Sequence, residues 1–104
     1  MRATKNTIIK ILKDAKPFLK SKGIEEIALF GSFAKEEQNV YSDIDLAIQK
    51  EENFLKKYSA YEYFEIVALI KENLQQKLHR RVDLFDLDSD SSFKSSIQEE
   101  LIYV

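Results

Sequence analysis

Hydrophobic residues recur at helical spacing in two long stretches of the chain. Within residues 5–21 they lie three or four positions apart, at Ile8, Ile11 or Leu12, Ala15 and Leu19, which predicts an amphipathic helix. Pro17 removes one intrahelical hydrogen bond from this stretch, so we expect a kink or an early end there, with Gly23 closing the segment. Residues 54–78 predict a second helix, whose apolar stripe covers a sheet: Tyr63, Val67, Ile70, Leu74 and Leu78, widened by Ile66 and Leu69.

Aromatic side chains crowd the first turns of this second helix. They are Tyr58, Tyr61, Tyr63 and Phe64. We expect them to pack in the core, and the alternative is an exposed surface that binds a partner.

Three shorter stretches read as β-strands, over residues 26–30, 43–48 and 81–86, the last with alternating polar and apolar positions. A short polar helix over 33–37 and a loop over 38–41 join the first two strands. After a polar loop over 87–92, residues 93–104 predict a closing helix with Ile97 and Leu101 or Ile102 facing inward. This order predicts an α/β (α+β) fold, in which helices flank a small mixed sheet of three strands or slightly more.

Composition narrows the class of protein. The 104 residues, 44% hydrophobic and 33% charged, suit one ordinary globular domain over residues 1–104. The chain has no cysteine, which excludes a disulfide framework and a cysteine-based zinc site. It has no long apolar run and no signal-peptide pattern, so we expect a cytoplasmic protein without membrane association. The net charge of -2 predicts no stable binding of long nucleic acids, and we interpret the early lysines as a solvated helix face.

Two aspartates, Asp43 and Asp45, stand one residue apart on the second predicted strand. Successive strand side chains point to opposite faces, so these carboxylates share a face, while Ile44 and Leu46 point into the core. Two like charges held this closely repel each other unless a cation binds between them. Mg²⁺ takes oxygen ligands, usually one or two carboxylates with waters and substrate phosphates. The pair therefore predicts a magnesium site.

Gly31 and Ser32 form a turn between the first strand and the short helix. Glycine lets the backbone approach a ligand closely, and Ser32 can open the helix, whose free N–H groups favour an anion. A metal site and a phosphate site would therefore face each other across one short loop.

The motif Gly-Ser, ten intervening residues and Asp-x-Asp, placed on strand, helix and strand, resembles the signature of the nucleotidyltransferase superfamily related to DNA polymerase beta. Within it the chain is most similar to the minimal nucleotidyltransferase group, MntA-like, whose members pair with HEPN-domain proteins as antitoxins. The resemblance implies the nucleotidyltransferase fold. It extends over most of the chain, and its specific motifs lie in residues 29–46 and 80–85.

The resemblance also implies roles for three carboxylates. Asp43 and Asp45 would bind two Mg²⁺ ions, and the superfamily's third acidic residue, on the next strand, corresponds to Asp83. Asp83 would complete the metal site near the attacking hydroxyl and help to remove its proton. The alternatives are a strand-edge aspartate without a role, or Asp86 or Asp88 in its place. We favour Asp83 because its neighbours place it opposite a buried face, and Asp86 then points to the other face.

The same resemblance implies that the turn at Gly31 binds the nucleotide. Ser32 and backbone N–H groups would hold the triphosphate of ATP, and Lys35 would neutralise phosphate charge. We group Ser42 with them; it either caps a turn or bonds a carboxylate. Where the group commonly shows G-S-x-A-R-G this chain has GSFAKE, so Lys35 keeps a charge without the arginine fork. Glu36 replaces a glycine, and we expect that it does not adopt a positive φ and that its charge disfavours a triphosphate.

His79 stands where the group often has a glycine, before Arg80 and Arg81. We interpret it as a helix-end residue that interacts with the helix dipole, the alternative being a catalytic base. The two arginines either reach phosphate or balance the acidic site.

The expected function is a Mg²⁺-dependent nucleotidyltransferase that moves AMP from ATP onto a hydroxyl. The resemblance implies that this hydroxyl belongs to a tyrosine of a partner HEPN-type toxin, with the chain as antitoxin of a type VII toxin–antitoxin pair. One alternative is a non-catalytic nucleotide-binding or interaction subunit, with Lys35 and Glu36 marking decay of the site. The other is a nucleotidyltransferase that acts on a small molecule.

Overall fold

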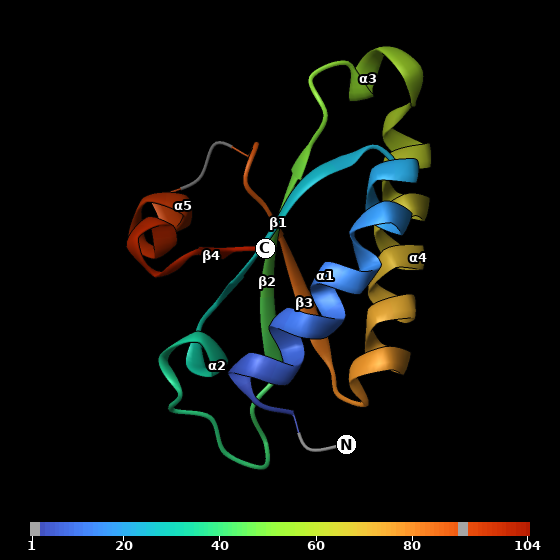
Figure 1. The fold of residues 1–104 in the computed structure, drawn as a ribbon. Helices are drawn as coiled ribbons and strands as arrows, with labels where there is room; N and C mark the ends of the chain where they lie inside the picture. Colours follow the sequence, from blue (N-terminus) through green and yellow to red (C-terminus); the bar gives the residue numbers. More distant parts are fainter. Residues whose placement is uncertain (1–2, 90–91) are drawn as a thin grey trace.

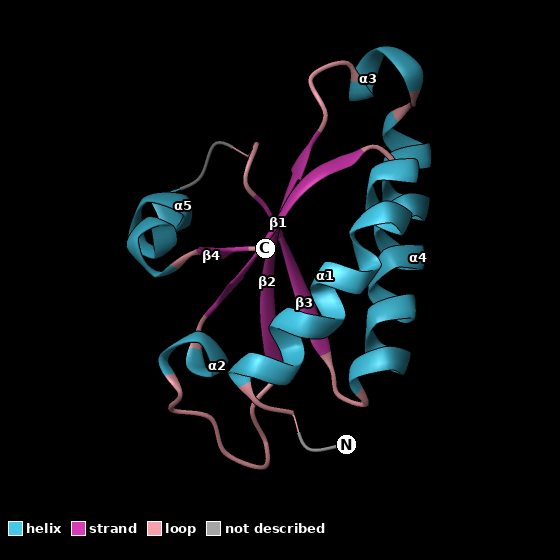
Figure 2. Cartoon of the chain, viewed as in Figure 1, coloured by secondary structure: helices cyan, strands magenta, loops and turns pink. Residues whose placement is uncertain are grey.

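The computed structural model describes residues 3–89 and 92–104, which form a four-stranded sheet with helices on both faces (Figures 1 and 2). In the sheet the strand order is β3-β2-β1-β4, with β1 antiparallel to β2 and β4, and β2 parallel to β3. This mixed sheet confirms the predicted fold class. The elements in chain order are α1 (Lys5–Ser21), β1 (Ile24–Phe30), α2 (Ser32–Lys35), β2 (Ile44–Lys50), α3 (Phe54–Lys57), α4 (Ala60–Leu78), β3 (Val82–Asp86), α5 (Ser92–Ile97), the 3₁₀ helix η1 (Gln98–Glu100) and β4 (Ile102–Tyr103).

Helices α1 and α4 cover one face of the sheet and α5 lies on the other (Figure 1). Alternation along β2 separates the two faces. Ile44, Leu46 and Ile48 are buried in the larger core with α1 and α4, whereas Ala47 packs with Phe30 in a smaller core beneath α5. None of the helices formed by the described residues is both long and apolar enough to cross a membrane.

Helix α1 begins with a capping box between Thr4 and Thr7, whose side chains each accept a hydrogen bond from the other residue's backbone N–H (2.8 and 3.2 Å). The helix continues past Pro17 to Ser21, so the expected early end is wrong. The carbonyl that Pro17 leaves without a partner belongs to Lys13, an exposed position where water can bind it. Burial of the helix's apolar stripe on the sheet holds the last turn in place.

The helix predicted over 54–78 is divided in two. Tyr58 has extended backbone dihedrals and ends α3, and Ser59 then caps α4. The Ser59 hydroxyl accepts from the Glu62 N–H (3.1 Å), and the Glu62 carboxylate accepts from the Ser59 N–H (3.0 Å). This second capping box gives α4 its own start, which the hydrophobic periodicity does not reveal.

The closing helix predicted over 93–104 is also wrong in its second half. Helix α5 ends at Ile97, a 3₁₀ turn follows, and β4 pairs with β1 through Ala28 opposite Tyr103 and Leu29 opposite Ile102. The free edge of β1 offers backbone hydrogen-bonding groups that a final helix would leave unpaired. The loop predicted over 87–92 includes residues 90 and 91, which lie outside the described residues.

The aromatic residues at the start of α4 do not all pack in the core. Tyr61 is 74% exposed and Phe64 is 68% exposed, so the prediction of core packing is wrong for these two. Tyr63 and Tyr58 are partly buried, and Tyr58 lies against the buried ring of Phe54 (4.7 Å between centroids). Helical spacing places Tyr61 and Phe64 away from the stripe that faces the sheet.

Candidate active site

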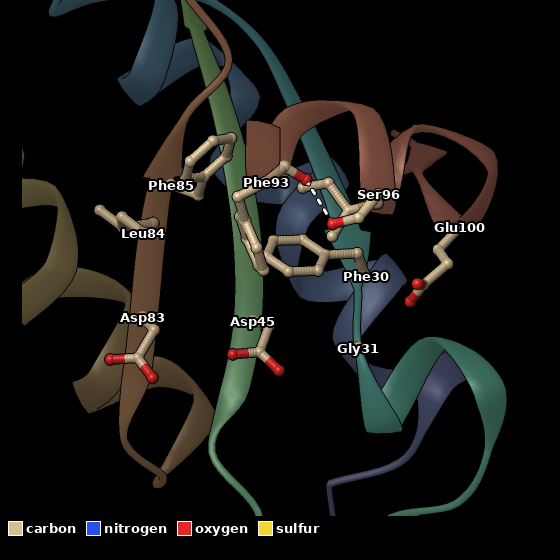
Figure 3. Close-up of a pocket in the computed structure, with 10 residues that line it drawn as sticks. Phe30, Gly31, Asp45, Asp83, Leu84, Phe85, Phe93, Ser96 and Glu100 are labelled. Carbon is tan, nitrogen blue, oxygen red and sulfur yellow. Dashed lines mark hydrogen bonds between the residues drawn. The ribbon is translucent and has the colours of Figure 1, made fainter. Parts of the chain in front are cut away.

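The register of the sheet brings two of the predicted carboxylates side by side. Asp45 on β2 is the direct partner of Asp83 on the parallel strand β3, and Phe30 on β1 is the partner of Asp45 on its other side. Both carboxylates line a cavity of about 550 Å³ on the α5 face of the sheet (Figure 3). Asp43 precedes the first residue of β2 and is not among the residues that line the cavity.

The cavity concentrates negative charge. Burial raises the pKa of Asp45, and the nearby charges of Asp83, Asp43 and Glu100 raise it further. Within residues 3–89 and 92–104, the three predicted aspartates form no ion pair with a basic side chain. The three aspartates are therefore carboxylates without a neutralising partner in the described residues, which is the electrostatic arrangement that a cation relieves.

Gly31 is required beside these carboxylates. Its φ is 77°, a conformation that favours glycine, and a β-carbon at this position would collide with the Asp45 carboxylate. The glycine thus lets the end of β1 pass directly against the Asp45 carboxylate. A short helix follows as predicted, but α2 spans Ser32–Lys35 and not residues 33–37, so Ser32 is its first residue, next to this close approach.

Two of the residues predicted to bind nucleotide have partners in the protein itself. The Lys35 ammonium lies 3.3 Å from the Glu100 carboxylate. The Ser42 hydroxyl accepts a hydrogen bond from the Asn39 N–H (2.9 Å), so of the two alternatives for Ser42 the structure contains the turn cap. Neither residue lines the cavity.

Arg80 connects the loop that precedes Asp43 with helix α2. Its Nη1 donates to the Ser42 carbonyl (2.8 Å) and lies 3.3 and 3.4 Å from the carbonyls of Val40 and Asn39. Its guanidinium also lies over the ring of Phe33, the buried residue of α2 (5.2 Å). In this structure Arg80 therefore fixes the loop before Asp43.

Among the described residues, two that are not glycine adopt the left-handed backbone conformation. Glu36 ends α2 at φ 59°, and His79 ends α4 at φ 53°. The expectation that Glu36 does not adopt a positive φ is therefore wrong. His79 lies at the helix end, as we interpreted it. Both residues hold a conformation that costs about 1 kcal/mol more than it does for glycine.

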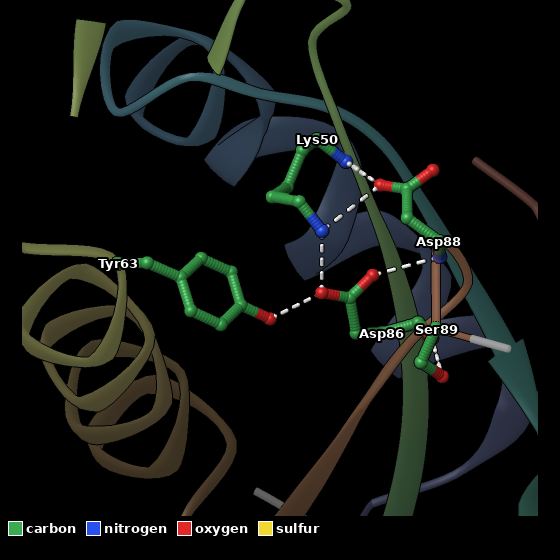
Figure 4. Close-up of polar contacts among 5 residues, drawn as sticks. All are labelled: Lys50, Tyr63, Asp86, Asp88 and Ser89. Atoms are coloured by element: carbon green, nitrogen blue, oxygen red, sulfur yellow. Dashed lines mark hydrogen bonds and ion pairs between the residues drawn. The ribbon is translucent and has the colours of Figure 1, made fainter. Parts of the chain in front are cut away.

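The other candidate for the third carboxylate lies on the opposite face. Asp86 accepts hydrogen bonds from Lys50 Nζ (2.6 Å) and from the Tyr63 hydroxyl of α4 (2.5 Å; Figure 4). Its neighbour Asp88 accepts from the Lys50 backbone N–H (2.9 Å). Neither Asp86 nor Asp88 lines the cavity that Asp45 and Asp83 share.

The sequence analysis missed several residues that complete the cavity. Phe30, Phe85 and Phe93 form its apolar end, and Glu100 lies at its rim. Phe85 follows Asp83 by two positions on one strand, so alternation was the signal that pointed to it. Phe93 reaches the site from α5, and Glu100 reaches it from the 3₁₀ helix η1 that follows; the sequence carries no local signal for either placement.

The residues present suit a divalent cation in their chemistry, because Mg²⁺ commonly takes only one or two carboxylates and completes its shell with water and phosphate. Among the described residues, no group of three or more acidic, histidine or cysteine side chains is close enough to enclose a metal ion by itself. Asp45 and Asp83, at paired strand positions, are therefore two carboxylates of the number and kind that Mg²⁺ commonly takes.

This sheet and its helices form the nucleotidyltransferase fold, and a solved structure described as a "putative minimal nucleotidyltransferase" matches it with a TM-score of 0.72 at 20% identity, covering 97% of this chain and 96% of that one. The chain belongs to the family described as polymerase beta nucleotidyltransferases, whose profile matches residues 6–104. A Methanocaldococcus jannaschii protein named "putative protein adenylyltransferase" is 40% identical over 104 residues, covering 97% of this chain and 98% of the relative.

A further solved structure, of a toxin–antitoxin with AMP-PNP, is 31% identical with a TM-score of 0.53, covering 88% of this chain and 63% of that one.

Proposed function

We propose that this chain is a protein nucleotidyltransferase that transfers AMP from ATP to a tyrosine hydroxyl of a partner HEPN-type toxin, and thereby acts as the antitoxin of a type VII pair. The observation that carries the proposal is the pairing of Asp45 with Asp83 beside the close approach of Gly31. The adenylyltransferase name of the 40% identical relative and the AMP-PNP in the toxin–antitoxin structure support the choice of donor and partner.

In the proposed reaction the acceptor oxygen attacks the α-phosphorus of ATP. A bond forms between that oxygen and the phosphorus, the bond from the phosphorus to the bridging oxygen breaks, and pyrophosphate leaves. The hydroxyl proton passes to the Asp83 carboxylate and then to water. Ser32 and the backbone N–H groups that follow Gly31 hold the triphosphate, and Lys35 reaches a phosphate by leaving Glu100.

Asp43, Asp45 and Asp83 are the residues that would hold Mg²⁺. Asp45 fits a cation because burial raises the pKa of its carboxyl, and the nearby charges of Asp83, Asp43 and Glu100 raise it further. When bound there, Mg²⁺ would supply positive charge that stabilises the attacking and leaving oxygens of an in-line displacement.

Label transfer tests the proposal. The purified chain is incubated with Mg²⁺, the protein that co-purifies with it or is encoded beside it, and ATP labelled at either the α- or the γ-phosphate. We expect α-label, and no γ-label, to become covalently attached to a tyrosine of that protein. Transfer of γ-label would identify a kinase instead and contradict the proposal.

A non-catalytic nucleotide-binding subunit is the second candidate, and the engagement of Lys35 by Glu100 is the observation that favours it. It predicts that Mg²⁺ and ATP together raise the melting temperature of the chain while no label is transferred to any protein. The label experiment therefore separates the two functions.

A further inference from the structure

The cavity beside the carboxylates has two chemically different ends. Asp45 and Asp83 supply one end, and the rings of Phe30, Phe85 and Phe93 supply the other (Figure 3). The Phe93 ring of α5 bridges the other two, with centroids 5.0 Å from Phe85 and 5.9 Å from Phe30 in edge-to-face geometry. An occupant of the whole cavity therefore needs an apolar ring at one end and a polar group at the other.

We infer that the aromatic end of this cavity binds the phenol ring of the acceptor tyrosine and points its hydroxyl at Asp83. This inference rests on the proposed function and deepens it, because it assigns a binding site for the acceptor to this chain.

The spacing along β3 supports a phenol. Asp83 and Phe85 are two residues apart on one strand, so their side chains share a face and are separated by about 6.5 Å along it. This separation is comparable to the distance from the centre of a tyrosine ring to an oxygen that accepts a hydrogen bond from its hydroxyl. A tyrosine that contacts Phe85 with its ring thus places its hydroxyl oxygen at the Asp83 carboxylate, which accepts the proton as the new oxygen–phosphorus bond forms.

Other occupants fit the cavity less well. A purine carries polar atoms around its edge, and at the aromatic end these atoms would face phenylalanine rings; the Ser96 hydroxyl there already donates to the Phe93 carbonyl (2.7 Å). A serine or threonine acceptor would leave the apolar end unfilled. A sugar would bring hydroxyls into that end, where they would lose their hydrogen bonds to water. A phenol has a single polar atom, at the end that meets the carboxylates.

Kinetics with matched phenylalanine variants test the inference. The acceptor is the protein labelled in the transfer assay, and the variants are Phe85→Leu and Phe85→Ala, with Leu55→Ala as control, because Leu55 is an exposed side chain on α3 that does not line the cavity. We expect Phe85→Ala to raise the acceptor concentration for half-maximal rate about five- to tenfold, as loss of an aromatic pair does, and Phe85→Leu to raise it less. The increase in melting temperature caused by Mg²⁺ and ATP should stay as in the wild type for all three.

Two results would overturn the inference. If Phe85→Ala abolishes the melting-temperature response to Mg²⁺ and ATP, the aromatic end binds adenine. If neither Phe85 variant changes the acceptor dependence, the ring binds elsewhere. Phe85→Leu keeps apolar volume in the cavity, so a fold defect in Phe85→Ala does not hide the answer.

A binding experiment separates this inference from the proposed function. N-acetyltyrosinamide is titrated into the full chain at millimolar concentration, and ring resonances of Phe85 and Phe93 are followed by NMR, with N-acetylserinamide for comparison. We expect shifts with the tyrosine compound alone. If the wild type transfers no label to any protein but these shifts occur, the proposed function fails and the phenol site stands; equal shifts, or none, with both compounds overturn the site.

Discussion

Two acidic groups lie on the same pair of strands and meet opposite electrostatic environments. Burial raises the pKa of Asp45, and the charges of Asp83, Asp43 and Glu100 raise it further. Burial also acts to raise the pKa of Asp86, but hydrogen bonds from Lys50, Tyr63 and a backbone N–H outweigh it, and that pKa is lowered. Among the described residues, Asp43, Asp45 and Asp83 have no basic partner, whereas Asp86 and Asp88 both pair with Lys50.

Strand alternation explains why the two groups separate. Asp83 and Asp86 are three positions apart on β3, so they point to opposite faces of the sheet. Asp86 points toward α4, where Tyr63 and Lys50 reach it and where the Lys50 ammonium also lies over the Tyr63 ring (5.0 Å; Figure 4). Asp83 points toward the open cavity. We conclude that an aspartate in this sheet stabilises the fold when it is paired and is available for a ligand when it is not.

The largest expected effect is on activity, from matched aspartate-to-asparagine changes at the two groups. Asp45→Asn should reduce AMP transfer on the order of a thousandfold, because it removes a carboxylate from the site of charge development. Asp86→Asn should leave the specific activity of the folded protein near the wild-type value. Label transfer per folded molecule is the measurement, and equal losses in both variants would contradict the division between the groups.

The free energy of unfolding should respond in the opposite way to the activity, with the larger loss in Asp86→Asn. Asp86→Asn should lower the free energy of unfolding by about 2 kcal/mol, because Lys50, whose side chain is only 13% exposed, loses the nearer of its two carboxylate partners. Asp45→Asn should leave the unfolding free energy equal or higher, since it relieves repulsion in the absence of metal. Urea denaturation measures both, and Asp88→Asn is the control, with a loss below about 1 kcal/mol because Asp88 is more exposed. A loss of 2 kcal/mol in Asp45→Asn would show that its carboxylate is paired in solution.

Much of this contrast follows from sequence, and part of it does not. The alternation of β2 and β3 is local, so the face of Asp45 and the opposite face of Asp86 follow from the sequence pattern. The pairing of Lys50 with Asp86 joins strand ends 36 positions apart, and the approach of Glu100 depends on β4 pairing with β1. Such contacts arise from tertiary packing, for which a single sequence carries no local signal.

The catalytic roles of Asp43, Asp45 and Asp83, and those of Gly31 and Ser32, remain predictions. The motif that indicated them is a spacing of residue types, whereas the occupants of the site are ligands that bind from outside the chain. For Lys35 and Ser42 the structure adds partners within the protein, Glu100 and Asn39, which the motif does not contain. The residues most easily named from sequence are thus those whose conformation is set locally, such as the glycine before α2.

The two acidic groups should make the stability depend on pH in opposite ways. A carboxylate with a raised folded-state pKa binds protons more tightly when folded, so the contribution of Asp45 in metal-free protein should grow as pH falls from neutrality toward the unfolded value of about 4. Asp86, with a lowered pKa, contributes stability above that unfolded value and loses it as pH falls through the folded pKa.

Urea denaturation between pH 3 and pH 8 measures these two slopes. Asp45→Asn should remove the gain in stability between neutrality and pH 4, and Asp86→Asn should reduce the loss at lower pH. An unchanged profile in Asp45→Asn would contradict the clustering of charge around that residue.

The smallest expected effects come from the two left-handed residues, Glu36 at the end of α2 and His79 at the end of α4. Glu36→Gly and His79→Gly should each raise the free energy of unfolding by about 1 kcal/mol, because glycine adopts their positive φ without strain. Glu37→Gly, at an exposed neighbour without positive φ, should instead lower it. Only Glu36→Gly also removes a negative charge at the end of α2, the helix proposed to hold the triphosphate, so only this variant should increase the melting-temperature response to Mg²⁺ and ATP. An equal response in His79→Gly would mean that the gain comes from backbone relaxation alone. The electrostatic contrast between the two acidic groups would then not extend to nucleotide binding.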